Sequence, residues 1–260
     1  MNYMEIKKVS FSYNQEPYIQ DLSLSISKGK LTTIIGANGS GKSTLLMLLG
    51  HIYKVQKGQI VLDNKNIDDY KLKEFARNVA IVHQKNELSS DLDVRTIVGH
   101  GRLPYLNYYQ NLGSKDNEII DWAIEITGLK SIENELLRNL SGGQQQKVWL
   151  AMALAQKTPY LLLDEPTTYL DIKAQIEILN LIKTINKEYH ITVIMVHHDI
   201  NQAIYYSDEI IAMKKGKILY QGKPQEVIHQ QSLKEIYNYD LKIIKDDTHM
   251  FILNYEDSMR

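Results

Sequence analysis

Residues 31–50 read LTTIIGANGSGKSTLLMLLG, and this stretch decides the fold. The apolar run Leu31 to Ile35 is typical of a buried strand, and Ser43 to Gly50 has the composition of a helix. The connection between them, Gly36 to Ser43, fits G-x-x-x-x-G-K-[ST], the pattern of a phosphate-binding loop. Its glycines let the backbone curl so that successive N–H groups point inward, and the helix start adds its positive end. The stretch therefore predicts strand, phosphate-binding loop and helix, with a generic glycine turn before a helix as the alternative interpretation.

This loop and the first residues of its helix supply candidate nucleotide ligands. We expect Lys42 to reach the β- and γ-phosphates of ATP and Ser43 to hold Mg²⁺. The candidate ATP-binding residues of the stretch are Gly36, Asn38, Gly39, Ser40, Gly41, Lys42, Ser43 and Thr44.

A second apolar strand, Tyr160 to Leu163, ends in the carboxylates of Asp164 and Glu165. Because ligands gather at the carboxyl ends of parallel strands, we expect Asp164 to face the nucleotide and hold Mg²⁺. Glu165 would lie beside the γ-phosphate, where a carboxylate takes a proton from the attacking water or orients it. An ordinary acidic pair after a strand is the alternative interpretation, and the phosphate-binding loop argues against it.

Outward from these motifs, strands alternate with helices. Polar and apolar residues alternate over Glu5 to Tyr13 and at Leu22, Leu24 and Ile26, which predicts antiparallel strands. Residues 88–157 have helical periodicity, and Ser114 is the predicted cap of a helix that ends at Gly128. After Pro159 strands return, so the predicted fold class is α/β: a phosphate-loop ATPase core with a mostly parallel sheet, an N-terminal antiparallel β subdomain and a nested helical subdomain.

The C-terminal third predicts three further features. Glu209 to Met213 and Ile218 to Tyr220 form a hairpin around a basic turn at residues 214–217, which is expected to be solvated. Pro224 opens a helix at its first position. Leu241 to Ile244 and Met250 to Leu253 form a terminal hairpin.

Composition excludes several classes of protein. The 260 residues are 43% hydrophobic and 23% charged, which rules out disorder, collagen and coiled coil. The chain has 30 Lys and Arg residues and 31 Asp and Glu residues, so no excess of positive charge indicates a surface that binds nucleic acid. The absence of cysteine removes disulfides, thiolate metal sites and cysteine nucleophiles. The N-terminus lacks a secretory-signal pattern and no apolar run is long enough to span a bilayer, so any membrane role is expected through a partner.

Leu140-Ser141-Gly142-Gly143-Gln144 is the most specific element. Ser141 can cap the helix that follows, and the glycine pair exposes N–H groups to an anion; alone, the element would indicate only an ordinary capped helix. Together with the loop and the strand ending in Asp164, it makes the chain resemble the ATP-binding cassette family over nearly its whole length. The resemblance implies that Ser141, Gly143 and Gln144 complete the ATP site of a second, opposed subunit.

The resemblance implies further roles one position at a time. Tyr13 takes the place of the aromatic that stacks on adenine, with packing at a sheet edge as the alternative. Gln84 follows an apolar strand, like the glutamine that senses Mg²⁺ and the nucleophilic water, and Asp171 matches the aspartate that communicates across the dimer. The implied catalytic residues are Glu165, His198 and Gln84, and the implied metal ligands are Ser43, Gln84 and Asp164.

Two neighbouring histidines compete for the role of the switch histidine, which hydrogen-bonds the γ-phosphate in the family. The family histidine directly precedes Asp, as His198 precedes Asp199, while the position before it is commonly Leu. We therefore assign His198 and regard His197 as a departure, with the reverse order as the alternative.

Three stretches narrow the resemblance: residues 99–105, 149–156 and 165–172. They resemble bacterial importers for ferric siderophores, with vitamin B12 and haem importers as near relatives. The family usually has His where Tyr169 stands. The implied function is the ATP-hydrolysing subunit of an importer for iron(III)–siderophore complexes, with ATP and Mg²⁺ as cofactors. A soluble cassette ATPase without a transport role and a nucleotide-binding regulator without turnover are the alternatives.

The implied organisation is one cassette ATPase domain over residues 1–260. Residues 1–87 and 158–224 would form the nucleotide-binding core, residues 88–157 the nested helical subdomain, and residues 225–260 a C-terminal extension. Such a subunit would form a homodimer on integral membrane permease subunits, together with a periplasmic or extracellular substrate-binding protein. Its expected location is the cytoplasmic face of the cell membrane, where it would be peripheral.

Overall fold

The computed structural model describes residues 3–14, 18–84, 91–107, 110–245 and 250–253, without the side chain of Tyr3. The chain divides into two compact units. Unit 1 comprises Met1–Asp68 and Ile194–Arg260, and unit 2 comprises Asp69–Val193. Each unit is described by itself below.

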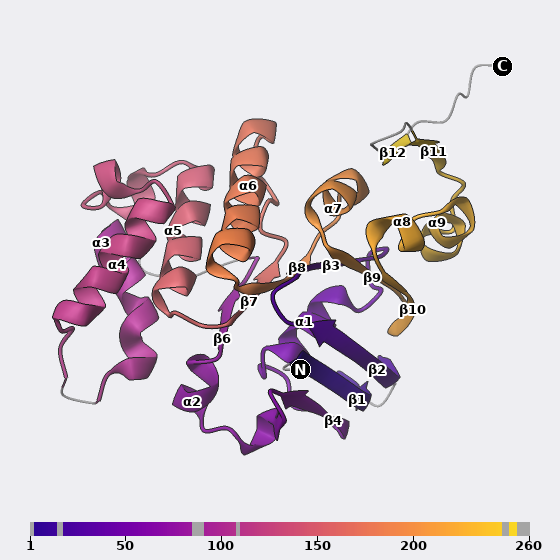
Figure 1. Ribbon diagram of the computed structural model, residues 1–260, viewed down its shortest axis with the longest axis horizontal. Coiled ribbons are helices and arrows are strands. Elements are labelled where there is room, and N and C mark those ends of the chain that lie inside the picture. The colour runs from indigo at the N-terminus through magenta and orange to yellow at the C-terminus, as the bar shows by residue number, and fades with distance from the viewer. Residues whose placement is uncertain (1–2, 15–17, 85–90, 108–109, 246–249, 254–260) are drawn as a thin grey trace. The chain divides into compact units, whose positions relative to one another are not determined.

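Unit 1 begins with an antiparallel sheet of strand order β2-β1-β4-β5. The strands are β1 (Tyr3–Phe11), β2 (Ile19–Ser27), β4 (Lys57–Leu62) and β5 (Lys65–Asn66). Leu22, Leu24 and Ile26 of β2 are buried while the residues between them face outward. The predicted antiparallel strands are therefore confirmed, because alternating side chains point to opposite faces of a sheet. Figure 1 shows β1, β2 and β4 side by side.

The fully buried strand β3 (Leu31–Ile35) pairs in parallel with β9 (Glu209–Lys214) in the same unit. Strand β10 (Lys217–Gly222) pairs antiparallel with β9, and β8 (Thr192–Val196) lies beside β3. Helix α1 (Lys42–Leu49) follows the loop after β3. The predicted strand, loop and helix are confirmed, and so is the hairpin around residues 214–217.

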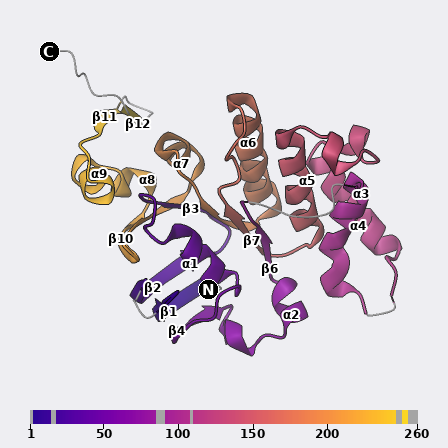
Figure 2. The same ribbon diagram turned by 180° about the vertical axis from the view of Figure 1, so that it is seen from behind.

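The C-terminal part of unit 1 has its own apolar cluster. It contains α7 (Ile200–Tyr206), α8 (Pro224–Val227), α9 (Gln230–Tyr237), β11 (Lys242–Lys245) and β12 (Met250–Leu253), which lie near one another in Figures 1 and 2. Pro224 occupies the first turn of α8, and β11 pairs antiparallel with β12, as predicted. Asn201 exchanges two hydrogen bonds with the backbone of Ile252, at 3.1 and 2.7 Å, which fastens the hairpin to α7.

Unit 2 combines parallel strands with a group of helices. Strands β6 (Val79–Val82) and β7 (Tyr160–Asp164) pair in parallel, so the predicted α/β class with parallel strands is confirmed. Helices α3 (Val94–Gly99), α4 (Ser114–Ile126) and α5 (Gly142–Ala155) lie side by side in Figures 1 and 2. The unit also contains the helices α2 (Leu72–Ala76) and α6 (Ile172–Tyr189). Its short 3₁₀ helices are η2 (His100–Tyr105), η3 (Lys130–Ile132) and η4 (Leu137–Asn139). A further 3₁₀ helix, η1 (Ile67–Asp69), precedes α2 and contains the point at which the two units divide.

Two predicted element ends are wrong. The residue that caps α4 is Gly113, not Ser114, because the carboxylate of Asp116 accepts the Gly113 N–H at 3.0 Å and draws Ser114 into the first turn. Strand β1 ends at Phe11, not at Tyr13, after register shifts that interrupt its pairing with β2. Both differences arise where one side chain or one irregular pair overrides the local pattern.

The predicted subdomain limits stay a prediction. The limit at residues 87 and 88 lies outside the described residues, and unit 2 extends beyond residues 88–157 on both sides. Among the described helices, none combines the length and the apolar content that a bilayer crossing needs.

Candidate functional site

The phosphate-binding loop of unit 1 has glycine at positions with a positive φ angle or without room for a Cβ atom. Gly36 has φ 149° and Gly41, which caps α1, has φ 103°. A Cβ atom on Gly36 would lie 2.3 Å from the carbonyl oxygen of Met213, so no larger residue fits there. The curled backbone predicted from the glycines is present.

Hydrogen-bond donors from the loop itself and from other parts of unit 1 bind the carbonyl groups of this loop. The ammonium of Lys42 donates to Gly36 O at 2.9 Å and to Ala37 O at 3.2 Å. The Tyr18 hydroxyl donates to Gly39 O at 3.1 Å, and the Gly216 N–H donates to Ser40 O at 2.8 Å. Because these carbonyls are turned toward protein donors, the loop is held curled by the protein itself.

The loop also fits a phosphate group. The Ser40 hydroxyl is buried and has no hydrogen-bond partner among the described residues, although a buried hydroxyl normally has one. It lies in a loop that leads into the N-terminus of α1, where anions are stabilised. Tyr18 and Gly216 are not among the predicted site residues, because only the folded chain brings them to the loop.

Tyr13 lies at the edge of an aromatic group in unit 1. Its hydroxyl is 2.8 Å from the Thr44 hydroxyl, and its ring meets those of Phe11, Tyr18 and Tyr53 edge to face. The hydrogen bond with Tyr13 raises the pKa of Tyr53. Because Tyr13 is still 54% exposed, its packing leaves ring surface on which an adenine could stack.

The two histidines after β8 have opposite environments. His197 is buried, its Nε2 is 2.7 Å from Oε1 of Gln202, and its backbone N–H donates to Ile34 O at 3.2 Å. His198 is exposed and precedes Asp199, which caps α7 by accepting the Gln202 N–H at 2.9 Å. His197 thus has a structural task within unit 1, whereas the side chain of His198 is exposed to solvent.

Unit 2 brings Gln84 and Glu165 together. The Gln84 amide donates to Oε2 of Glu165 at 2.7 Å, and the Thr168 hydroxyl donates to the same oxygen at 3.1 Å. Asp164 is buried as the last residue of β7, and Glu165 follows it with a left-handed φ of 51°. The turn after β7 therefore separates the two carboxylates: one is enclosed and the other is held by two donors.

The Ser141 element begins α5 as predicted. The Gln144 N–H donates to Oγ of Ser141 at 3.3 Å, and Oε1 of Gln144 accepts the Ser141 N–H at 2.9 Å, which is a capping box. A Cβ atom on Gly143 would lie 3.0 Å from the Cβ of Ala174. Asp171 caps α6 by accepting the Ala174 N–H at 2.8 Å. Asp171 therefore has a structural task in addition to any role at a subunit interface.

Residues 99–105 pack closely against the helices of unit 2 and form hydrogen bonds with them. A Cβ atom on Gly101 would lie 2.1 Å from the carbonyl oxygen of Met152. Arg102 is 5% exposed and donates to Asp116 at 2.9 Å and to Ala155 O at 2.8 Å. The Tyr105 ring packs against this guanidinium, whose carbon is 3.9 Å from the ring centroid, and its hydroxyl donates to Gln156 O at 2.9 Å. The contacts of this stretch therefore lie inside unit 2, where they hold its helices together.

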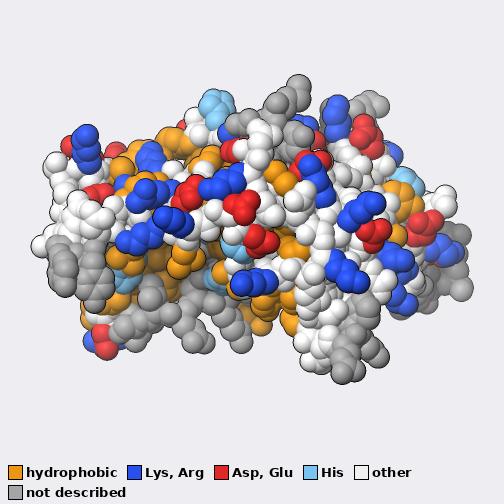
Figure 3. Space-filling view, turned by 90° about the horizontal axis from the view of Figure 1, so that it is seen from below, with side chains coloured by type: hydrophobic (Ala, Val, Ile, Leu, Met, Phe, Trp, Pro, Cys, Tyr) orange, Lys and Arg blue, Asp and Glu red, His pale blue; other side chains and the backbone are white. Residues whose placement is uncertain are grey.

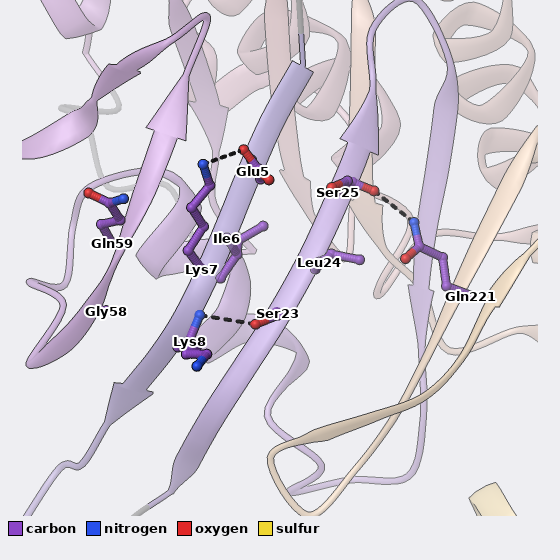
Figure 4. Close-up of a pocket in the computed structure, with 10 residues that line it drawn as sticks. All are labelled: Glu5, Ile6, Lys7, Lys8, Ser23, Leu24, Ser25, Gly58, Gln59 and Gln221. Atoms are coloured by element: carbon purple, nitrogen blue, oxygen red, sulfur yellow. Dashed lines mark hydrogen bonds and ion pairs between the residues drawn. The ribbon is translucent and has the colours of Figure 1, made fainter.

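A groove on unit 1 lies apart from all predicted site residues. It runs over the outer face of β1, β2 and β4, and Figure 4 shows Glu5 paired with Lys7 and the Gln221 amide bound to Ser25 O. None of the described His, Asp and Glu side chains form a group of three or more that could hold a metal ion. On the face shown in Figure 3, basic and acidic side chains are interspersed.

Together, the loop, the capped glycine pair and the strand ending in Asp164 and Glu165 define a nucleotide-binding ATPase cassette. The family model for ABC transporters matches residues 19–168, and the chain belongs to that family. It is an ABC ATPase.

Relatives and a solved structure match nearly the whole chain. The petrobactin import ATP-binding protein FpuC of Bacillus anthracis is 41% identical over 93% of this chain and 89% of its own length. The iron(3+)-hydroxamate import ATP-binding protein FhuC of Bacillus subtilis is 42% identical over 95% of this chain and 91% of its own length. The ATP-binding cassette MJ0796, solved as a dimer in a post-hydrolysis state with ADP and Pi, is 30% identical with a TM-score of 0.72, covering 85% of this chain and 98% of that one.

Proposed function

We propose that this chain is the ATP-hydrolysing subunit of a bacterial importer that takes up iron(III)–siderophore complexes. The observation that carries the ATPase role is the pair of donors, from Gln84 and Thr168, on the carboxylate that follows Asp164. The cargo rests on the relatives at 41% and 42% identity, which are named for petrobactin and iron(3+)-hydroxamate import.

ATP would be held mainly by unit 1. The loop N–H groups and the Lys42 ammonium would bind the β- and γ-phosphates. The Lys42 ammonium is already held at the loop, because it donates hydrogen bonds to two of the loop's carbonyl oxygens. The exposed ring surface of Tyr13 would stack on adenine. Asn38, Gly39, Ser40, Gly41 and Thr44 would complete the contacts to phosphate oxygens.

Ser43, Asp164 and Gln84 would hold Mg²⁺. Hydroxyl, carboxylate and amide oxygens are the hard ligands that Mg²⁺ prefers, so the donor set fits this ion. When bound, Mg²⁺ neutralises negative charge on the phosphate oxygens.

Glu165 would take a proton from the attacking water or orient it. Its carboxylate is held at Oε2, so its direction is set before the reaction. His198 would hydrogen-bond the γ-phosphate, which agrees with its exposure and with the structural task of His197.

The working assembly would be a homodimer. Ser141, Gly143 and Gln144 at the N-terminus of α5 would act on the ATP bound by the other copy, and Asp171 would communicate between the copies. Tyr169 and Ile172, beside Asp171, are 86% and 76% exposed, which is unusual for large apolar side chains and suits a surface covered by a second copy. The dimeric structure of MJ0796 supports this arrangement.

This homodimer would sit on integral membrane permease subunits at the cytoplasmic face of the cell membrane. A periplasmic or extracellular substrate-binding protein would deliver the cargo. The nested helical subdomain, residues 88–157, would move as ATP closes the dimer, and that motion is what a permease can use.

A deletion strain tests the cargo. We expect it to lose growth on ferric siderophores as the sole iron source and to regain growth with the wild-type gene but not with Lys42→Ala. Unchanged radio-iron uptake from every siderophore, with lost uptake of cobalamin or haem, would move the assignment to those importers. Unchanged uptake of all three would favour a soluble cassette ATPase without a transport role.

A further inference from the structure

We propose that Thr168 is a positioning residue that fixes the Glu165 carboxylate for the attack of water on ATP. This inference rests on the role proposed above for Glu165. It concerns a hydroxyl in unit 2 that lies within residues 165–172 but is not among the predicted site residues.

The contact geometry carries the proposal. The Thr168 hydroxyl donates to Oε2 of Glu165 at 3.1 Å, and the Gln84 amide donates to the same oxygen at 2.7 Å. Two donors on one oxygen fix the rotation of the carboxylate, so its other oxygen has a defined direction. A carboxylate that must meet a water molecule gains from such a fixed direction.

The backbone delivers the Thr168 hydroxyl to this place. Glu165 and Tyr169 both have left-handed φ angles, 51° and 66°, which non-glycine residues adopt infrequently. The Thr168 N–H donates to Glu165 O at 3.2 Å and closes the turn between them. The position of the Thr168 hydroxyl relative to the Glu165 carboxylate is therefore fixed, because both residues belong to one closed turn.

The two donors differ in what else they must do. Gln84 lies two residues after the end of β6, and in the proposed function it also contacts Mg²⁺. Gln84 would offer its amide oxygen to Mg²⁺ while its amide N–H donates to Glu165, whereas the Thr168 hydroxyl has no proposed role other than its bond to Glu165. Thr168 is thus the donor whose bond to Oε2 does not depend on the placement of Gln84 at the metal ion.

The chemistry specifies which replacements conserve the role. Valine has nearly the shape of threonine but no hydroxyl, so Thr168→Val removes the hydrogen bond alone. Serine keeps the hydroxyl, so Thr168→Ser retains the donor. A hydrogen bond to a charged group is worth about a tenfold change or more, and because Gln84 donates to the same oxygen we expect the lower end of that range.

The test uses the permease-bound complex with ATP. We expect Thr168→Val to lower kcat about tenfold with KM for ATP changed by less than about twofold, and Thr168→Ser to keep kcat within about threefold of wild type. Thr96→Val is the matched control, because the Thr96 hydroxyl also donates to a carboxylate, that of Asp93, at 3.1 Å in the same unit. It should leave kcat and KM unchanged.

Several results would overturn the proposal. They are a wild-type kcat in Thr168→Val, a change confined to KM, or a Thr168→Ser variant as slow as Thr168→Val. Thermal unfolding of each variant detects misfolding, and Thr168→Ala, which also lacks the hydroxyl, replaces Thr168→Val in the test if the valine variant unfolds. Glu165→Gln separates the two hypotheses: if it hydrolyses ATP normally, the role of Glu165 fails as well, whereas an inactive Glu165→Gln beside an active Thr168→Val refutes Thr168 alone.

Discussion

Replacing Arg102 by methionine should destabilise unit 2 more than any exposed charge change. Arg102 is 5% exposed, and it binds Asp116 at 2.9 Å and Ala155 O at 2.8 Å while it packs on the Tyr105 ring. Methionine conserves the apolar stem but leaves the carboxylate of Asp116 and the carbonyl of Ala155 without their cation.

The magnitude follows from the partners that are left behind. Breaking a buried ion pair by removing one partner costs about 3–5 kcal/mol. Asp116 keeps its bond from the Gly113 N–H at 3.0 Å and is 15% exposed, so we take the lower end, about 3 kcal/mol. That is a large part of the about 5–15 kcal/mol that stabilises a typical protein.

Urea unfolding followed by tryptophan fluorescence measures the loss of stability in unit 2. The chain has two tryptophans, Trp122 and Trp149, and both lie in unit 2. The fluorescence midpoint of Arg102→Met should fall by about 1 M or more, given slopes of about 1–3 kcal/mol/M. A double-mutant cycle with Asp116→Asn should show strong coupling, because the two side chains are in contact.

Arg138→Met is the control for this experiment. Arg138 pairs with Asp91 in the same unit, but both side chains are more than half exposed, so the midpoint should barely move. An unchanged midpoint in Arg102→Met, or strictly additive effects of the two single changes, would refute the reasoning.

Three further predictions concern catalysis and pH. Glu165→Gln should bind Mg-ATP, turn over about 10²–10⁴-fold more slowly and accumulate as an ATP-bound dimer in gel filtration; near-normal hydrolysis would contradict the role of Glu165. Mixing Lys42→Ala chains with Ser141→Arg chains should form one site with both lesions and one intact site, so ATPase activity of permease-bound complexes should exceed that of either variant; no recovery would contradict action across the dimer. The Gly113 N–H and then Arg102 lower the pKa of Asp116 below its ordinary value of 3.8, so this carboxylate stabilises unit 2 above that pH and the contribution is lost as the pH falls through the lowered value. Asp116→Asn should remove that part of the acid sensitivity in fluorescence-monitored unfolding, and an unchanged acid transition would contradict it.

Much of the fold follows from short stretches of sequence. The strand, loop and helix of residues 31–50, the Ser141 cap and the helix opened by Pro224 all depend on backbone geometry and hydrogen bonds within a few residues. Such local constraints act wherever the stretch stands in the chain, so the pattern suffices to predict them.

The prediction fails where a neighbour competes for the same group. Ser114 has the right residue type for a cap, but Asp116 takes the Gly113 N–H and moves the helix start by one residue. Arginine is a residue type that is mostly found at the surface, and only the hydrogen bonds of Arg102 to Asp116 and Ala155 explain why it is buried. Neither outcome is encoded in the periodicity of the segment itself.

The sequence by itself determined the class of protein, the phosphate-binding loop and the identity of Lys42, Asp164 and Glu165 as candidate site residues. Only the tertiary structure decided which groups from distant parts of the chain hold the phosphate-binding loop and the Glu165 carboxylate. Gly216 reaches Ser40 across 176 positions and Gln84 reaches Glu165 across 81, at 2.8 and 2.7 Å. Motifs are set by the sterics and hydrogen bonding of neighbouring residues, whereas these contacts depend on which strands pair and in what order, so they exist only once the chain has folded.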